Sequence, residues 1–291
     1  TNCPDMSAAS SHPIGVFDSG IGGLSVLQAL QSALPHEHFV YLADNAHAPY
    51  GEKTDEFVRQ RTHAIADHLI AHHQIKALVV ACNTATAAAI HELRTHHPDL
   101  VLVGVEPALK PAVALSRTGH IGVMATRGTV NSEKFARLVS SVQAQAHFSI
   151  QACNGLALAI EQSTLTEQAD AAQERISALL AQYTAAMGHF GSAPGQIDTL
   201  VLGCTHYVFV EKPLQTLLGP DVQLVSTGEA VARHTKHLLE NARLLRTGPA
   251  PLSPAHRMSL LTTGDLHGLQ AAGQRWLGLP HAACHKANPP V

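Results

Sequence analysis

The chain has 291 residues and a formal net charge of −3, with 45% hydrophobic and 14% charged residues. This balance offers no general attraction to nucleic acid or to an anionic membrane, so neither is expected as a partner. No apolar run reaches the roughly 18 residues that a membrane-spanning helix requires.

The first residues, TNCPDMSAASSHP, lack a basic region followed by an apolar one and do not resemble an export signal. We interpret residues 1–12 as a disordered lead-in and expect a cytoplasmic protein. Reduced thiols are the default in that compartment.

From residue 14 onward, apolar runs alternate with helix-forming segments. The predicted order is strand 14–18, helix about 22–33, strand 38–42, helix about 54–73, strand 77–81 with a helix behind it, and strand 101–105. Continuous apolar strands separated by helices are typical of a parallel sheet that is covered on both faces. The predicted fold class is therefore α/β.

The second half of the chain repeats the pattern of the first. IGVMAT (121–126) resembles IGVFDS (14–19), and TLVLGCTH (199–206) resembles ALVVACNT (77–84). The first strand and the cysteine are 68 positions apart in the first half and 83 in the second. We assign the difference to a Gly- and Pro-containing loop at 186–196.

The repeat predicts two pseudo-symmetric lobes, each a mostly parallel sheet flanked by helices, with the active site in the cleft between them. We assign residues 13–106 and about 211–282 to the first lobe and residues 107–210 to the second. Residues 283–291 are interpreted as a tail. In open parallel sheets, ligands bind beyond the carboxyl ends of the strands.

Two of the five cysteines, Cys82 and Cys204, follow equivalent strands at that position. Each precedes a threonine that can cap the next helix, and a helix N-terminus stabilises a thiolate. Two thiols on opposite sides of a cleft can remove an α-proton from one face of an amino acid and return one to the other. Asp18 and His206 lie near these strand ends and could manage the protons. The pattern predicts a racemase or epimerase that needs no cofactor.

The remaining cysteines, Cys3, Cys153 and Cys284, are interpreted as structural residues, because cysteine commonly behaves as a small buried hydrophobe. No Cys-x-x-Cys pair is present, which argues against a zinc ribbon and a disulfide framework. The 21 histidines lack the His-Glu-x-x-His spacing, so we expect solvated surface histidines and no metal site.

The stretch DSGIGG (18–23) looks like a phosphate loop, but Ser25 occupies the place of the third glycine in the dinucleotide pattern. A nucleotide site is therefore not expected. APYG (48–51) has the composition of a turn. Asn83-Thr84 and Thr205-His206 supply donors suited to a carboxylate, which would also stabilise the charge that forms when an α-proton leaves.

Seven motifs occur in order: FDSGIGGLSVL, YLADNAHAPYGEK, VVACNTATAAAI, GVEPALKPA, GVMATRGTVNSEKF, LVLGCTHYVF and LTTGD. With these motifs the chain resembles glutamate racemase, of the aspartate/glutamate racemase superfamily, from Ile14 to about Gly278. The resemblance implies that Cys82 and Cys204 are the acid–base pair. It also implies racemisation of glutamate without pyridoxal phosphate or metal, which supplies D-glutamate for peptidoglycan.

The resemblance further implies a set of site residues. Asp18 and Ser19 would bind the substrate amino group, Asp18 would manage the proton of Cys82, and Glu161 would lie beside His206. The substrate-binding residues implied by the resemblance are Asp18, Ser19, Pro49, Tyr50, Gly51, Asn83, Thr84, Thr126, Thr129, Thr205 and His206. Local helix capping is an alternative for Thr126 and Thr129. The TTGD stretch (262–265) is assigned to packing and capping.

Two other functions are compatible with these motifs. A racemase of a related acidic amino acid such as aspartate would share the cysteine pair. A two-lobed amino-acid-binding protein without catalysis would not need paired strand-end thiols. The family also suggests a homodimer, a cell-wall precursor as activator and, in some members, inhibition of DNA gyrase, all of which the sequence leaves open.

Overall fold

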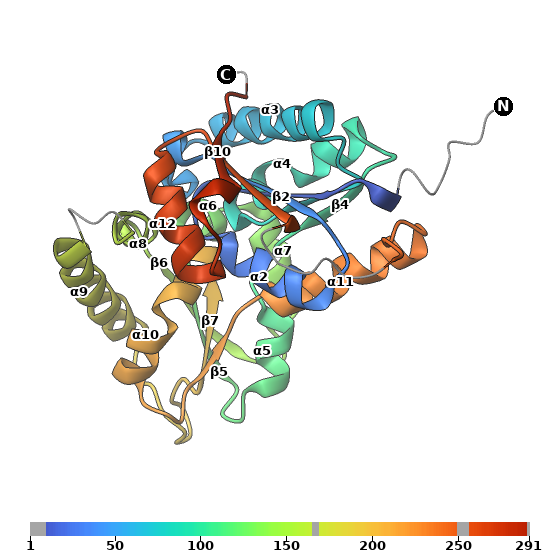
Figure 1. Cartoon of the computed structure of the whole chain (residues 1–291). Coiled ribbons are helices and arrows are strands. Elements are labelled where there is room, and N and C mark those ends of the chain that lie inside the picture. The colour runs from blue at the N-terminus through green and yellow to red at the C-terminus, as the bar shows by residue number, and fades with distance from the viewer. Residues whose placement is uncertain (1–9, 165–168, 249–255, 290–291) are drawn as a thin grey trace.

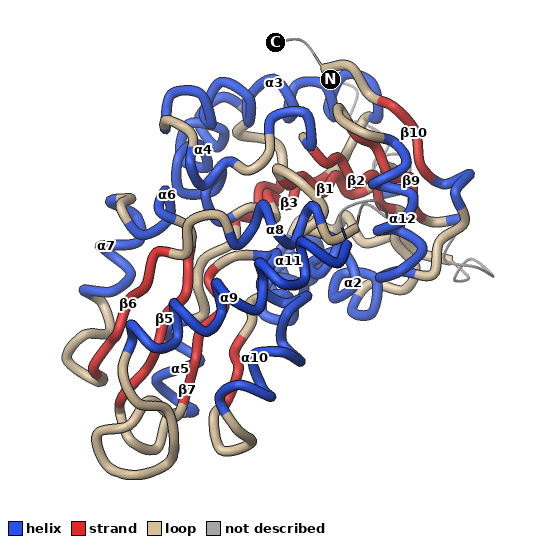
Figure 2. The backbone as a smooth tube through the Cα atoms, turned by 90° about the vertical axis from the view of Figure 1, so that its left-hand side faces the viewer, coloured by secondary structure: helices blue, strands red, loops and turns tan. Residues whose placement is uncertain are grey.

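The strands form two separate sheets in the computed structural model, which describes residues 10–164, 169–248 and 256–289 (Figures 1 and 2). The larger sheet has the order β10-β9-β2-β1-β3-β4 and the smaller has the order β6-β5-β7-β8. All neighbouring strands are parallel. The predicted α/β class with two mostly parallel sheets is therefore confirmed.

The strands are short. Their bounds are β1 Ile14–Asp18, β2 Phe39–Ala43, β3 Ala77–Val80, β4 Val101–Gly104, β5 His120–Ala125, β6 His147–Ala152, β7 Thr199–Gly203, β8 Gln223–Val225, β9 Met258–Thr262 and β10 Cys284–Lys286. The α-helices are α2 Leu24–Ala33, α3 Asp55–His73, α4 Asn83–His96, α5 Leu109–Leu115, α6 Arg127–Val130, α7 Glu133–Ser140, α8 Leu156–Gln162, α9 Ala169–Met187, α10 Glu211–Leu218, α11 Gly228–Asn241 and α12 Leu266–Leu277. Short 3₁₀ turns include η1 Asn45–His47, η2 Tyr50–Glu52 and η4 Thr205–Val210.

Helices cover both faces of the larger sheet (Figure 1). On one face, α2, α11 and α12 pack against side chains such as Ile14 and Val16. On the other face, α3 and α4 pack against Phe17 and Val80. Because successive strand side chains point to opposite faces, a strand buried on both sides must be apolar throughout. This explains the continuous apolar runs seen in the sequence.

The internal repeat is visible in the strand order. In the larger sheet, β1 lies between β2 and β3, and in the smaller sheet β5 lies between β6 and β7. The strand that precedes Cys82 (β3) is therefore equivalent to the strand that precedes Cys204 (β7). The predicted correspondence of IGVFDS with IGVMAT, and of ALVVACNT with TLVLGCTH, is confirmed at the level of topology.

The predicted lobe boundaries need three corrections. The chain returns to the larger sheet after residue 225, not at about 211, because β8 extends the smaller sheet and α10 packs near α9. Residues 284–286 are not part of a tail, since β10 pairs with β9. The lead-in ends before residue 12, because the backbone oxygens of Ser10 and Ser11 accept hydrogen bonds from Lys76 and Arg246. Cys3 lies outside the described residues.

The loop predicted at 186–196 begins slightly later, because α9 continues to Met187. A bridge between Phe190 and Ile197 then closes the turn. Over the described ranges, no helix has both the length and the apolar character needed to cross a bilayer.

A buried ion pair joins the amino ends of β2 and β3, away from the cysteines. Nζ of Lys76 lies 2.5 Å from Oε2 of Glu37, and their side chains are 1% and 2% exposed. The backbone N–H of Arg246 donates to the other carboxylate oxygen of Glu37 at 2.8 Å. Burial lowers the pKa of Lys76, and Glu37 opposes that shift.

We predict that Glu37→Ala destabilises the fold by about 3–5 kcal/mol, because it leaves the buried Lys76 ammonium without the carboxylate that balances its charge. The melting temperature should fall by roughly 10 °C in a thermal melt followed by circular dichroism. The double variant Glu37→Leu/Lys76→Met removes both charges and should recover most of the loss. A single variant as stable as the parent would show that the pair contributes little.

Candidate active site

The two strand-end thiols come from opposite lobes. Cys82 follows β3 and directly precedes α4, and Cys204 follows β7 and directly precedes η4. Both cysteines are buried, with 5% and 7% of their surface exposed. The carboxyl ends of parallel strands meet at one edge of a sheet, so each lobe presents its thiol at the edge where ligands bind in α/β folds.

The Cys82 thiol lies in an apolar and negatively charged environment. Burial raises its pKa well above the ordinary value, and the charges of Asp18 and Cys204 act in the same direction. Its thiol donates to Oγ of Ser19 at 3.8 Å, a weak contact. At neutral pH this cysteine is therefore a protonated thiol and can donate a proton. It can act as a base only after another group has accepted that proton.

Asp18 ends β1 and is fully buried. Its Oδ2 accepts hydrogen bonds from the backbone N–H of Gly23 at 2.5 Å and from the hydroxyl of Thr205 at 3.3 Å. Its Oδ1 has no hydrogen-bond partner among the described residues. Burial raises the pKa of this carboxyl group, and the nearby His206 charge opposes the shift. A carboxyl group with a raised pKa and one unpaired oxygen accepts a proton more readily than an ordinary aspartate does.

His206 connects the second thiol to a carboxylate. Its Nδ1 lies 3.7 Å from Sγ of Cys204, and its Nε2 lies 2.7 Å from Oε2 of Glu161. Burial by itself lowers the pKa of His206, but the contacts with Cys204 and Glu161 outweigh burial and raise the pKa well above 6.5. The imidazolium form is favoured, and its positive charge lies beside the sulfur of Cys204.

Two glycines allow the lobes to meet at this point. A Cβ on Gly22 would overlap the imidazole of His206 and the hydroxyl of Thr205. A Cβ on Gly20 would overlap the carboxylate of Glu161. The DSGIGG stretch is thus glycine-rich because second-lobe side chains pack directly on its backbone.

The predicted carboxylate-binding residues lie at helix N-termini. Both amide atoms of Asn83 are buried and have no partner among the described residues, which is costly unless a ligand or water satisfies them. The hydroxyls of Thr84 and Thr126 lie 2.9 Å apart, so they join the two lobes. Thr126 also caps α6 and contacts the hydroxyl of Thr129. Thr126 therefore both caps α6 and lies at the contact between the two lobes.

The Pro49-Tyr50-Gly51 stretch approaches the second lobe as well. Gly51 packs so closely on Thr126 that a Cβ would overlap it. The hydroxyl of Tyr50, however, donates a hydrogen bond to the carboxylate of Asp44 at 2.6 Å. Burial raises the pKa of Asp44, but hydrogen bonds from Arg61 and Tyr50 outweigh burial and lower it. Tyr50 thus contributes its ring and backbone to this region, while its hydroxyl donates its hydrogen bond to Asp44.

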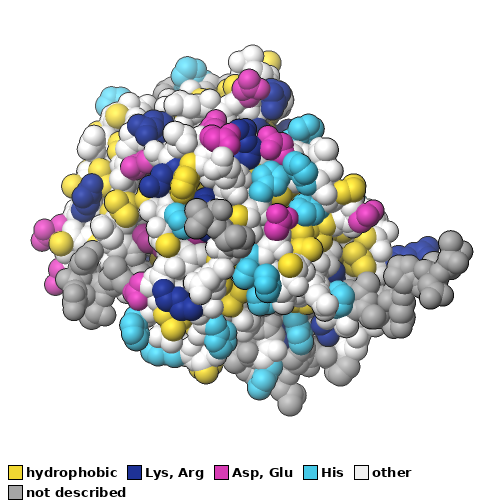
Figure 3. Space-filling view, turned by 90° about the horizontal axis from the view of Figure 1, so that it is seen from above, with side chains coloured by type: hydrophobic (Ala, Val, Ile, Leu, Met, Phe, Trp, Pro, Cys, Tyr) yellow, Lys and Arg dark blue, Asp and Glu magenta, His cyan; other side chains and the backbone are white. Residues whose placement is uncertain are grey.

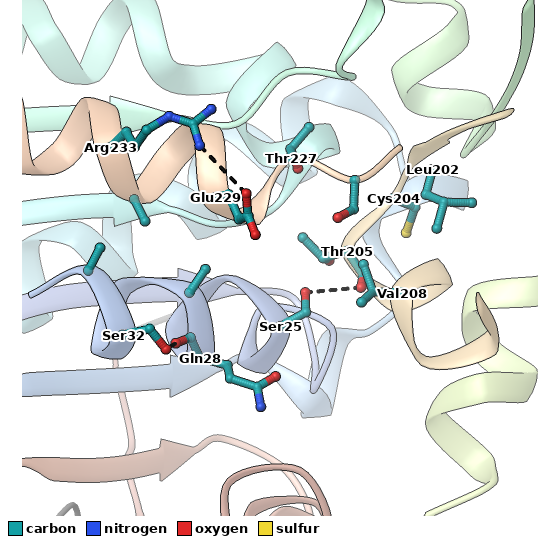
Figure 4. Close-up of a pocket in the computed structure, with 15 residues that line it drawn as sticks. Ser25, Gln28, Ser32, Leu202, Cys204, Thr205, Val208, Thr227, Glu229 and Arg233 are labelled. Atoms are coloured by element: carbon teal, nitrogen blue, oxygen red, sulfur yellow. Dashed lines mark hydrogen bonds and ion pairs between the residues drawn. The ribbon is translucent and has the colours of Figure 1, made fainter. Parts of the chain in front are cut away.

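A cavity of about 540 Å³ adjoins Cys204 on the side of α2 and α11 (Figure 4). Ser25 and Thr205 line it and are joined by a 3.3 Å hydrogen bond, and Glu229 and Arg233 lie at its other end. Cys82 and Asp18 are not among the lining residues. A ligand in this cavity would therefore not lie between the two thiols.

Histidine side chains are spread over the surface seen in Figure 3. Within the part of the chain that the structure describes, no three His, Cys, Asp or Glu side chains are arranged to hold a metal ion. Cys153 and Cys284 are buried in the cores of the second and first lobes.

Two residues of the site were not singled out from the sequence. Asp44 anchors Tyr50 and Arg61, and Asn45 donates to Glu161 across the lobe boundary. Both follow the predicted strand 38–42. Because the carboxyl end of every parallel strand reaches the ligand edge, polar residues after this strand could have been flagged by the rule that identified Cys82.

A model of the Asp/Glu/hydantoin racemase family matches residues 14–235. The glutamate racemase of Ectopseudomonas mendocina is 45% identical over 269 residues, which cover 92% of this chain and 96% of that protein. The glutamate racemase of Ralstonia nicotianae is 44% identical over 273 residues, covering 94% and 92% of the two chains.

Solved structures agree with the sequence comparison. Glutamate racemase isoform RacE1 of Bacillus anthracis superposes with a TM-score of 0.81 at 29% identity and covers 97% of this chain and 99% of its own. The Escherichia coli glutamate racemase in complex with L-glutamate and the activator UDP-MurNAc-ala superposes with a TM-score of 0.78 at 29% identity, covering 96% and 100%.

The chain therefore belongs to the Asp/Glu/hydantoin racemase family. It is an amino-acid racemase, and the resemblance to glutamate racemase inferred from its motifs is confirmed.

Proposed function

We propose that this racemase interconverts L-glutamate and D-glutamate, with Cys82 and Cys204 as the two acid–base groups and without a cofactor. The observation that carries the proposal is the pair of buried thiols at equivalent strand ends of the two lobes, each with its own proton-managing partner. Asp18 serves Cys82, and the His206–Glu161 pair serves Cys204.

For L-glutamate, the Cys204 thiolate takes the α-proton and the Cys82 thiol donates a proton to the opposite face. The imidazolium of His206 favours the thiolate on Cys204, and burial keeps Cys82 protonated. D-glutamate reacts in reverse, with Cys82 as the base after it has passed its proton to Asp18 and with Cys204 as the acid after it has taken a proton from the imidazolium of His206. Each cycle thus begins with one thiolate and one thiol, as inversion requires.

The substrate carboxylate gains negative charge as the α-proton leaves. We assign its binding to Asn83, Thr84 and Thr205, whose amide and hydroxyl groups can donate to it. Support comes from the unpaired amide of Asn83 and the burial of all three side chains. Asp18 and Ser19 are assigned to the α-amino group, and Tyr50, Gly51, Thr126 and Thr129 to the walls of the cleft.

Circular dichroism of the substrate tests the proposal. The signals of L-glutamate and D-glutamate should each decay to zero when the enzyme is added, while the signal of L-aspartate persists. Faster racemisation of L-aspartate than of glutamate would favour an aspartate racemase. No decay with any acidic amino acid would favour a binding protein without catalysis.

We predict that removal of metals and carbonyl cofactors leaves the activity intact, because thiol acid–base chemistry needs neither. The protein is dialysed against a chelator, treated with hydroxylamine and assayed with L-glutamate. The rate should stay within about twofold of the untreated enzyme, as expected if no bound group supplies chemistry. Loss of activity that zinc or pyridoxal phosphate restores would contradict the cofactor-free mechanism.

The product D-glutamate is proposed to supply peptidoglycan synthesis in the cytoplasm, and the enzyme to form a homodimer. The Escherichia coli relative was crystallised with the activator UDP-MurNAc-ala, and we propose that a cell-wall precursor of this kind also activates the present enzyme. An increase in kcat/KM on addition of UDP-MurNAc-L-alanine would support this, and an unchanged value would contradict it.

A further inference from the structure

Asn45 bridges the two lobes beside the second thiol. It is the first residue of η1, directly after β2 and Asp44, and its side chain is half-buried. Its Nδ2 donates a hydrogen bond to Oε1 of Glu161 on α8. This contact joins a loop of the first lobe to the carboxylate that holds His206.

The amide of Asn45 has a fixed orientation. The buried hydroxyl of Thr262 accepts a hydrogen bond from the backbone N–H of Gly264 at 3.0 Å. It therefore directs its own proton to Oδ1 of Asn45, also at 3.0 Å. With Oδ1 occupied as an acceptor, the NH₂ group must point toward Glu161.

Glu161 in turn is held from several sides. The backbone N–H of Ile21 donates to both carboxylate oxygens, at 3.2 and 3.1 Å, and Asn45 donates to Oε1. Oε2 is thereby left facing Nε2 of His206 at 2.7 Å. The ring orientation that puts Nδ1 next to Cys204 depends on this carboxylate.

We propose that Asn45 is a positioning residue for the Cys204 half of the reaction. It holds the carboxylate of Glu161 in the orientation that faces Nε2 of His206, so that Nδ1 of the ring remains aimed at Cys204. Thr262 of the TTGD stretch, assigned above only to packing and capping, orients Asn45. The proposal rests on the two-thiol function proposed above and adds a residue that does not itself touch the reacting atoms.

Loss of this hydrogen bond should slow the proton transfer at Cys204 more than the one at Cys82. We expect Asn45→Ala to lower kcat/KM by about tenfold, the effect of losing one hydrogen bond to a charged group. Because enantiomers have equal free energy, kcat/KM must fall equally in both directions. The asymmetry will appear instead in the exchange of hydrogen with solvent.

Heavy water reveals which half-reaction is slowed. In the Asn45→Ala variant, D-glutamate loses its α-proton to Cys82, but the following protonation by Cys204 is slow. The deprotonated substrate is therefore often reprotonated by Cys82, and recovered D-glutamate should contain more deuterium than with the parent enzyme. Recovered L-glutamate should not. Equal labelling of both recovered enantiomers, or racemisation at the parental rate, would overturn the proposal. Protium retained in the first product of the parent enzyme would instead contradict the two-thiol function itself.

A second variant removes the risk of misfolding. Asn45→Asp has the same shape but places a carboxyl group against Glu161, and two such groups share a proton as the pH falls. Other titratable groups near this pair are unchanged between the two variants: His206 on η4 with Asp18 beside it, Tyr41 on β2, and Asp44 held by Arg61. The activity of Asn45→Asp relative to Asn45→Ala should therefore rise between pH about 8.5 and 6.

A ratio that does not change with pH would show that the side chain acts only by filling space, and would overturn the proposal. The matched control is Asn241→Ala, which removes an asparagine that hydrogen-bonds to His237 on the exposed end of α11. It should match the parent enzyme in rate and in labelling. A tenfold loss in this control would show that Asn-to-Ala changes act through the fold, which also contradicts the proposal.

Discussion

Replacement of either Cys82 or Cys204 by alanine is expected to lower the kcat/KM of glutamate racemisation by ~10³-fold or more. In the proposed mechanism each thiol acts on one face of the substrate, so the remaining thiol cannot complete the inversion. Both cysteines are buried, and alanine is small enough to be accommodated without overpacking. The measurement is the decay of the circular dichroism signal of L-glutamate and of D-glutamate.

The matched controls for these variants are Cys153→Ala and Cys284→Ala. Both residues are buried like Cys82 and Cys204, but Cys153 follows β6 and Cys284 begins β10, so neither follows one of the equivalent strands β3 and β7. They should retain the parental rate within about twofold, since the loss of one core atom group affects stability and not chemistry. A folded Cys153→Ala protein without activity, combined with active strand-end variants, would reverse the assignment.

Replacement of His206 by asparagine is expected to lower kcat by about 10²-fold. Asparagine can hydrogen-bond to Cys204 but carries no positive charge, so the proposed thiolate on Cys204 loses the positive charge of His206 beside it. The KM should change less than kcat, because the larger effect is on proton transfer. Michaelis parameters measured from each enantiomer provide the test.

His91→Asn on the exposed face of α4 is the control for this variant. It should leave both parameters within about twofold, as surface substitutions usually do. A His206→Asn enzyme with the parental kcat would show that the imidazolium does not support the Cys204 thiolate. The roles of Glu161 and Asn45 would then also need another explanation.

The architecture could be predicted to a large extent because the sequence repeats itself. The two strand-end cysteines lie after equivalent strands, and local hydrophobic runs are sufficient to find strands that are buried on both faces. Strand β6 (His147–Ala152) was not predicted because it is only partly buried and has no continuous apolar run. β8 and β10 have three residues each, too few for a pattern.

The lobe boundaries and the supporting residues of the site depend on contacts between distant parts of the chain. Asn45 and Glu161 are 116 positions apart, and Thr262 and Asn45 are 217 apart. No local pattern encodes such pairs. The motif that contains Asp44 and Asn45 was identified, but the sequence did not indicate that Asp44 takes up the hydroxyl of Tyr50.

The central claim is that two different thiols face opposite sides of the substrate Cα. Racemisation in heavy water, stopped within the first turnovers and followed by mass spectrometry of the separated enantiomers, tests it most directly. Because each thiol carries one exchangeable proton, the two-thiol mechanism predicts product with deuterium at Cα and recovered substrate with much less. Substantial retention of protium in the first-turnover product would mean that one base carries the original proton across, and would contradict the two-thiol mechanism.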